Sequence, residues 1–223
     1  MTSNDWWMHL LWVFAAGVVG FGITAVCAGR LKLRRGWLVL AYALIAGAFL
    51  TAYLTWIQTD LLEELRRHWL VGIAGAVVVG FLMVRNVLSQ PSSLPSEGVQ
   101  LAFDLVWSGA VYGVLDGVFL SVMPLLASRQ AFADLGWSGG WLGTVGAALA
   151  GMLASSYVTA AYHLGYPEFR GSAVVMPILG NDIMSLGTIL TGNPLTAVLS
   201  HGAMHMAAVL HGMEATIQLP PHY

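Results

Sequence analysis

The chain has little cysteine, little charge and almost no lysine. Each of these shortages excludes a type of bond, a class of protein or a kind of partner. Its single cysteine, Cys27, rules out an intrachain disulfide and leaves no redox signal. Only 9% of the residues are charged, against roughly 25% in an ordinary soluble domain. One lysine and eight arginines provide no basic surface for nucleic acid, so no nucleic-acid partner is expected.

What the chain has instead is apolar sequence: 57% of its 223 residues are hydrophobic, and the mean hydropathy is +0.74. A helix needs about 20 apolar residues to cross a hydrocarbon core of roughly 30 Å. Seven runs of suitable length occur, at residues 8–28, 37–57, 69–89, 101–127, 138–163, 172–190 and 194–212. The sixth run contains Pro177, Asn181 and Asp182, and is expected to be kinked or re-entrant. The sequence therefore predicts an all-α, polytopic transmembrane helical bundle with six or seven spans.

A polar, proline-rich segment, SQPSSLPSEG, separates the first three runs from the last four. We therefore expect a three-helix membrane segment over residues 1–90, a polar loop over 91–100 and a four-helix membrane core over 101–223. Four cations, at positions 30, 32, 34 and 35, lie in the first short loop, which favours an outside N-terminus and a cytoplasmic first loop. The expected location is a bacterial cytoplasmic membrane, with the lipid bilayer as the first partner.

Ionisable residues inside the predicted spans gather in the last four runs. They are Asp104, Asp116, Asp182, His163, His201, His205 and His211. A central Asp opposes insertion by about 2.5–3.5 kcal/mol, so these groups are expected to face one another inside the bundle. His201 and His205 are four residues apart, which stacks both rings on one helix face. His211 is rotated off that face and is assigned an interfacial role.

Two stretches of the C-terminal half resemble a known family. These are ASSYVTAAYHLGYP, which ends around His163, and LGNDIMSLGTILTGNPLTAVLSHGAMHMAAVL, which contains a Thr-Gly-Asn turn ten residues before His201. They resemble the FxxxH motif and the last motif of the CPBP family, the CAAX-processing and bacteriocin-processing intramembrane proteases. The resemblance covers residues 100–212.

The resemblance implies a membrane-embedded hydrolase that attacks a peptide bond with an activated water. Asp116 lies where a glutamate of the family's EExxxR motif would be expected, but the second acid and the arginine are missing. Thr159 replaces the phenylalanine of FxxxH, and His205 replaces the asparagine of HxxxN. The candidate catalytic residues are Asp116 as general base, with His163, His201 and His205 positioning substrate and stabilising charge.

Two other functions stay open on the sequence. His163, His201 and His205, with one carboxylate, form a donor set suited to zinc or iron, or to axial ligation of a haem. That set would belong to a metal- or haem-binding subunit working with other membrane subunits, whereas the hydrolase would act on a membrane-associated peptide. The degenerate EExxxR motif also fits a non-catalytic scaffold or immunity-type relative that holds no cofactor.

Overall fold

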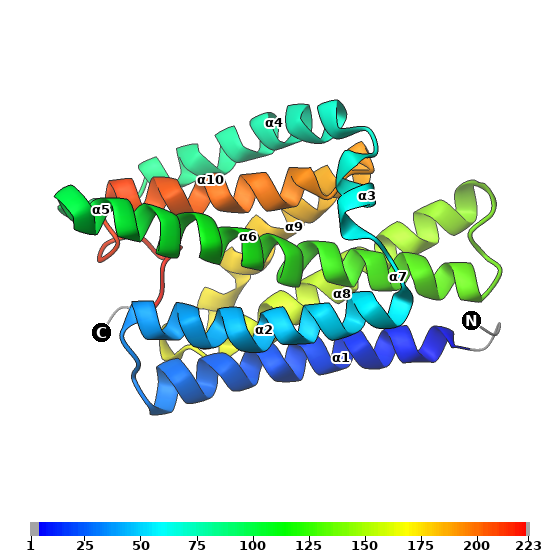
Figure 1. Ribbon diagram of the computed structural model, residues 1–223, viewed down its shortest axis with the longest axis horizontal. Coiled ribbons are helices and arrows are strands. Elements are labelled where there is room, and N and C mark those ends of the chain that lie inside the picture. Colours follow the sequence, from blue (N-terminus) through cyan, green and yellow to red (C-terminus); the bar gives the residue numbers. More distant parts are fainter. Residues whose placement is uncertain (1–4, 222–223) are drawn as a thin grey trace.

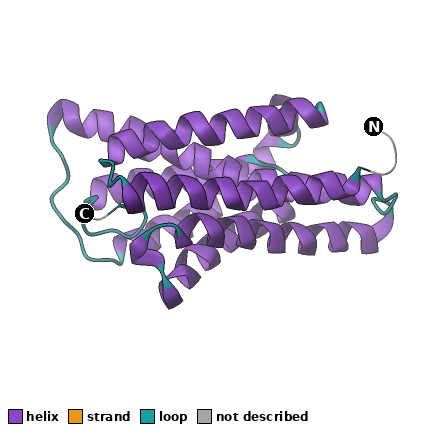
Figure 2. Ribbon diagram, turned by 90° about the horizontal axis from the view of Figure 1, so that it is seen from below, coloured by secondary structure: helices purple, strands orange, loops and turns teal. Residues whose placement is uncertain are grey.

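The structure is a computed structural model that describes residues 5–221. Every regular element in that range is helical, which confirms the predicted all-α bundle. Figure 2 shows the long helices running side by side, with loops at the two ends. The α-helices are α1 (Trp6–Ile23), α2 (Arg35–Ile57), α3 (Leu61–Arg66), α4 (Trp69–Leu88), α5 (Gly98–Asp104), α6 (Tyr112–Asp116), α7 (Met123–Asp134), α8 (Gly140–Leu164), α9 (Val175–Thr191) and α10 (Leu195–His211).

Six helical stretches are long and apolar enough to cross a membrane, and the chain is an integral membrane protein. They cover residues 6–30, 35–57, 69–88, 98–134, 140–164 and 171–191. Large apolar side chains such as Leu153 and Leu190 are about three-quarters exposed, which suits a surface that faces lipid. The seventh predicted run became α10, which at 17 residues is shorter and is enclosed by its neighbours.

The predicted break in the sixth run is wrong. Pro177 is the third residue of α9, and the helix continues from there to Thr191. Proline is tolerated in the first turn because the backbone N–H that it lacks has no partner within the helix there. The short 3₁₀ turn η5 (Gly171–Val174) leads into this start.

The helix that carries Asp116 is the longest in the molecule. It runs from residue 98 to residue 134 through α5, α6 and α7, joined by the π-helical segments η2 (Leu105–Val111) and η3 (Gly117–Val122). Asp116 is the last residue of α6, immediately before η3. Wider π-helical turns inside α-helices occur frequently at functional sites.

The long helix and α10 are in backbone contact. A Cβ atom added to Gly113 would lie 2.8 Å from Gly202 Cα, and one added to Gly117 would lie 2.8 Å from Val198 Cα. Gly109, one turn earlier, meets Met206 in the same way. Small residues at a spacing of four let two membrane helices approach this closely.

The other side of α10 packs on α4, so that α10 lies between α4 and the long helix (Figure 1). Gly75 lies against Thr196, and Gly80 against Ser200. Residues 91–97 of the predicted polar loop carry no regular secondary structure. The boundary between an N-terminal and a C-terminal membrane unit stays a prediction.

The Thr-Gly-Asn turn sets where α10 begins. Gly192 has a φ of +63°, the left-handed conformation that lets α9 end and the chain reverse. The Asn193 amide nitrogen then donates to backbone carbonyls of the segment that contains α3, at Glu64, Leu65 and Arg67. This turn therefore fixes where α10 begins. It also sets the position of His201 and His205 along the axis of the bundle.

Candidate functional site

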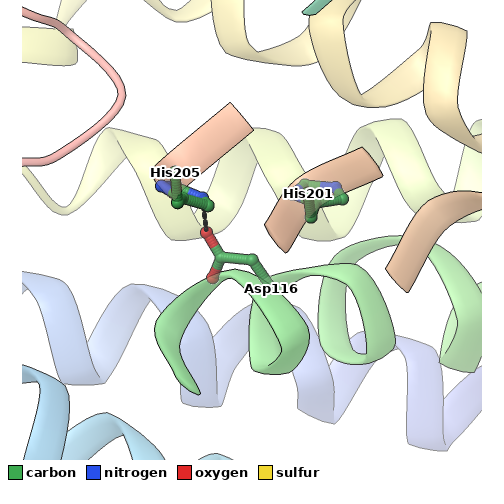
Figure 3. A group of neighbouring side chains, drawn as sticks. All are labelled: Asp116, His201 and His205. Carbon is green, nitrogen blue, oxygen red and sulfur yellow. Dashed lines mark hydrogen bonds and ion pairs between the residues drawn. The ribbon is translucent and has the colours of Figure 1, made fainter. Parts of the chain in front are cut away.

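Asp116, His201 and His205 come together inside the bundle (Figure 3). All three are buried, and one potential ligand atom of each lies within 4.8 Å of the other two. The Nε2 atom of His205 lies 3.1 Å from Oδ2 of Asp116. The two imidazole rings are stacked with centroids 6.2 Å apart, the arrangement that a spacing of four residues predicts.

Asn181 makes several side-chain hydrogen bonds, and one of them holds the ring of His201. Ser155 donates its proton to the carbonyl of Leu120, so it accepts from Asn181 Nδ2 at 2.7 Å, and this fixes the orientation of the amide. The Asn181 Oδ1 atom accepts from Ser121 at 2.6 Å and lies 3.2 Å from His201 Nε2. Because an amide oxygen can only accept, His201 carries its proton on Nε2.

The same reasoning applies to His205, whose Nε2 faces a carboxylate that accepts hydrogen bonds. A ring that carries its one proton on Nε2 keeps a lone pair on Nδ1. His201 Nδ1, His205 Nδ1 and Asp116 Oδ1 are all buried without a hydrogen-bond partner. Buried polar atoms in native proteins nearly always have a partner, so three in one cluster indicate a place for an ion or for water.

A cavity of about 70 Å³ adjoins the cluster. Its polar lining includes Asp116, His201, His205, His163 and Gln218. This volume exceeds the roughly 10–15 Å³ that one water requires, but it is far below the roughly 300–1,000 Å³ of pockets for larger ligands. A porphyrin does not fit this space, so the geometry gives no support to haem ligation.

His163 shares the cavity but not the compact group. Its Nδ1 donates to the carbonyl of Thr159 at 2.8 Å, one turn earlier in α8. Its ring packs edge-on against Tyr162 and Phe169, with centroids 5.1 and 5.0 Å away. The structure therefore brings together three of the four predicted site residues and places His163 on the cavity wall.

The expectation that all the intramembrane acids face one another is wrong. Asp104 accepts hydrogen bonds from Ser96 and Gln100 near the end of the bundle. Asp182 accepts from Ser156, on α8. Local donors satisfy Asp104 and a serine of the neighbouring helix satisfies Asp182, and helical periodicity does not distinguish these two carboxylates from Asp116.

His211 has a structural role at the end of α10. Its Nε2 donates to the carbonyl of Gln90 at 2.9 Å, which joins α10 to the loop after α4. It takes no part in the site.

Sequence reasoning missed a chain of tyrosines beside the site. Tyr112 packs against the His205 ring with centroids 4.8 Å apart, and its hydroxyl lies 2.7 Å from that of Tyr162. The Tyr162 hydroxyl lies 3.0 Å from that of Tyr166, just beyond α8. Burial raises the pKa of Tyr166 above its ordinary value, so this phenol stays protonated. Tyr162 and Tyr166 are four residues apart, the one sequence signal for this chain.

A second missed group involves His9, near the start of α1. Its Nδ1 lies 3.2 Å from the Tyr53 hydroxyl and its Nε2 lies 3.2 Å from Asp134 Oδ2. These bonds link α1, α2 and α7 across sequence separations that no local pattern reveals.

Comparison of the chain with protein-family models, curated proteins and solved structures finds no match. The resemblance to the CPBP family therefore stays a prediction from short motifs.

Proposed function

We propose that this integral membrane protein binds a divalent transition-metal ion, zinc by preference, through Asp116, His201 and His205. One observation supports the proposal above all. Two imidazole nitrogens and one carboxylate oxygen are buried in the same cluster without a hydrogen-bond partner. Two histidines with one carboxylate are an established donor set for zinc and for non-haem iron.

The spacing of the cluster fits such an ion. Ligand atoms about 2.0–2.1 Å from a tetrahedral zinc lie about 3.3 Å from one another. One potential ligand atom of each residue already lies within 4.8 Å of the other two, so side-chain rotation would bring the three donors to the spacing of such an ion. The hydrogen bond from His201 Nε2 to Asn181 is the kind of outer contact that orients a ligating imidazole.

Three protein ligands leave a coordination position open for water. A zinc ion held by Asp116, His201 and His205 would supply Lewis-acid activation of that water. The proposed reaction is hydrolysis of an amide bond in a membrane-associated peptide, the substrate class that the CPBP resemblance implies. The cavity itself has room for water only, so the peptide would have to reach it through an opening of the wall. A bacterial cytoplasmic membrane and contacts with other membrane subunits remain predictions.

Metal content tests this proposal directly. Protein purified in detergent and dialysed against trace zinc is expected to retain about one equivalent by elemental analysis. Asp116→Asn, His201→Ala and His205→Ala are each expected to lose it. His68→Asn is the matched control, because His68 is exposed outside the site and its left-handed backbone suits asparagine. Equal zinc retention in all five proteins would contradict the proposal.

A metal-independent hydrolase is a second candidate, favoured by the free Oδ1 atom of Asp116 and the adjacent room for water. In that case Asp116 would be the general base, with the histidines stabilising charge. Cleavage of a prenylated or membrane-spanning peptide would then survive a chelator and be lost in Asp116→Asn. Chelator-sensitive cleavage would instead favour the metal site.

If the folded, stable protein neither binds zinc nor cleaves peptides, the remaining interpretation is a non-catalytic scaffold. His201→Ala would then lower the melting temperature and change nothing else.

A further inference from the structure

The segment after α10, residues 213–221, forms part of the wall of the histidine cavity. Ile217, Gln218 and Pro220 line the cavity together with the site residues. Figure 1 shows this red segment turning back from the end of α10 toward the start of α2. It therefore lies between the site and the end of the bundle that carries the basic first loop.

Arg35, at the start of α2, holds this segment through its backbone. Its Nε donates to the carbonyl of Leu219 at 3.1 Å. Its Nη2 donates to the carbonyls of Met213 at 3.3 Å and Pro221 at 3.1 Å. The Arg35 side chain is only 14% exposed, so these charge-assisted bonds are largely shielded from water.

Further contacts define the path of the segment. The backbone N–H of Ile217 donates to Gln90 Oε1 at 3.2 Å. Leu219 is fully buried in the main apolar core. Gly212 has a φ of +105°, and a Cβ there would meet Ser93 at 2.2 Å, so only glycine permits this reversal.

One polar atom of the segment lies at the cavity without a hydrogen-bond partner. Gln218 Oε1 is buried without a hydrogen-bond partner, as are the free atoms of the histidine cluster. Gln218 lines the same cavity as Asp116 and His205. The segment thus completes the polar lining of the site and also covers it.

We propose that residues 213–221 form the movable wall of this site, and that Arg35 is the positioning residue that keeps the wall closed. Water, ions and other small solutes enter the cavity from the basic end of the bundle when the segment detaches. Loss of the Arg35 guanidinium removes three donors from backbone carbonyls and shifts the segment toward the open state. This inference goes beyond the proposed function and does not depend on what the cavity binds.

Thiol labelling measures this access. The native thiol is removed by Cys27→Ala, and Met204→Cys places a reporter on the cavity wall. A small, positively charged methanethiosulfonate is expected to label it slowly. Labelling should be at least about tenfold faster with Arg35→Gln, because three charge-assisted hydrogen bonds no longer hold the segment. Arg35→Lys should give an intermediate rate, since lysine keeps the charge but not the planar fork.

Two controls separate opening of the wall from general loosening. Arg34→Gln removes the neighbouring exposed cation and should leave the rate unchanged. Ala131→Cys is buried in α7, and α7 lies toward the other end of the bundle (Figure 1), so this reporter should label equally slowly with or without Arg35. The proposal is overturned if Arg35→Gln leaves Met204→Cys labelling unchanged, or if it accelerates both reporters alike. No metal is needed, so the result is separate from the zinc measurement.

Discussion

At the residue scale, the chemistry of the site depends on which nitrogen of each histidine is already engaged. Asn181 and Asp116 each occupy an Nε2, and this leaves both Nδ1 atoms free. Asn181 has a further consequence for stability, because it joins three helices through Ser121, Ser155 and His201.

Asn181→Ala is expected to destabilise the protein. The substitution leaves the Ser121 hydroxyl and His201 Nε2 without this acceptor, and Ser155 keeps only the Ser185 hydroxyl as a donor. Interhelical hydrogen bonds in membrane proteins contribute less than about 1 kcal/mol each on average, and stranded buried groups cost more, so we expect a loss of about 2 kcal/mol. Thermal unfolding in detergent measures it. Asn86→Ala, also on the cavity wall, is the control. Equal melting temperatures for the two variants would contradict a stabilising role for the Asn181 hydrogen bonds.

The sequence predicted the stacked pair and, through the family resemblance, Asp116 beside it, but not the hydrogen bonds that hold the two rings. Helical periodicity alone places His201 and His205 on one face, since that depends only on local geometry. The pairing of His205 with Asp116, and not with Asp104 or Asp182, depends on how α10 sits against the long helix. His163 was grouped with the site because it matches the histidine of the FxxxH motif, yet its Nδ1 is satisfied within its own helix.

At the scale of elements, the decisive feature is the glycine spacing on the long helix. The most glycine-rich stretch of the sequence, residues 136–151, lies elsewhere, at the start of α8. Gly113 and Gly117 are less conspicuous in sequence, and they meet the backbone of α10 directly. The sequence pattern identifies small residues, but the contact that needs them depends on tertiary packing.

Gly113→Ala is expected to prevent correct packing of α10. Its Cβ would lie 2.8 Å from Gly202 Cα and 2.9 Å from the His201 carbonyl oxygen, and backbone atoms cannot rotate away. The helices must separate, which should cost at least about 2 kcal/mol and lower zinc retention. Gly47→Ala, where nothing lies within 4 Å, should be neutral or slightly stabilising. Size-exclusion profiles and melting temperatures check both variants, and a stable, zinc-retaining Gly113→Ala protein would contradict this packing.

At the scale of the whole molecule, the two ends of the bundle differ in charge and in role. The end with the basic first loop also carries the segment after α10, because Arg35 binds that segment directly. Hydropathy predicted the helices well, since each had to be long and apolar to cross lipid. It could not show that α10 is the helix that the others enclose, because apolar runs that face lipid and apolar runs that face protein look alike.

The charge distribution predicts that this end lies in the cytoplasm. A green fluorescent protein fused after residue 223 should therefore fluoresce, and alkaline phosphatase fused there should be inactive. The same two reporters placed ahead of residue 1, behind a suitable export signal for the phosphatase, should show the opposite pattern. An active C-terminal phosphatase would reverse the orientation, and the site would then open to the outside.

The most direct test of the central claim is X-ray absorption at the zinc edge on protein loaded with one equivalent of zinc. The account predicts a first shell of nitrogen and oxygen at about 2.0–2.1 Å, with no sulfur and with the outer-shell scattering of two imidazoles. His205→Ala should reduce the imidazole scattering or abolish zinc binding. A spectrum of hydrated zinc, or one unchanged by that substitution, would show that Asp116, His201 and His205 do not form a metal site.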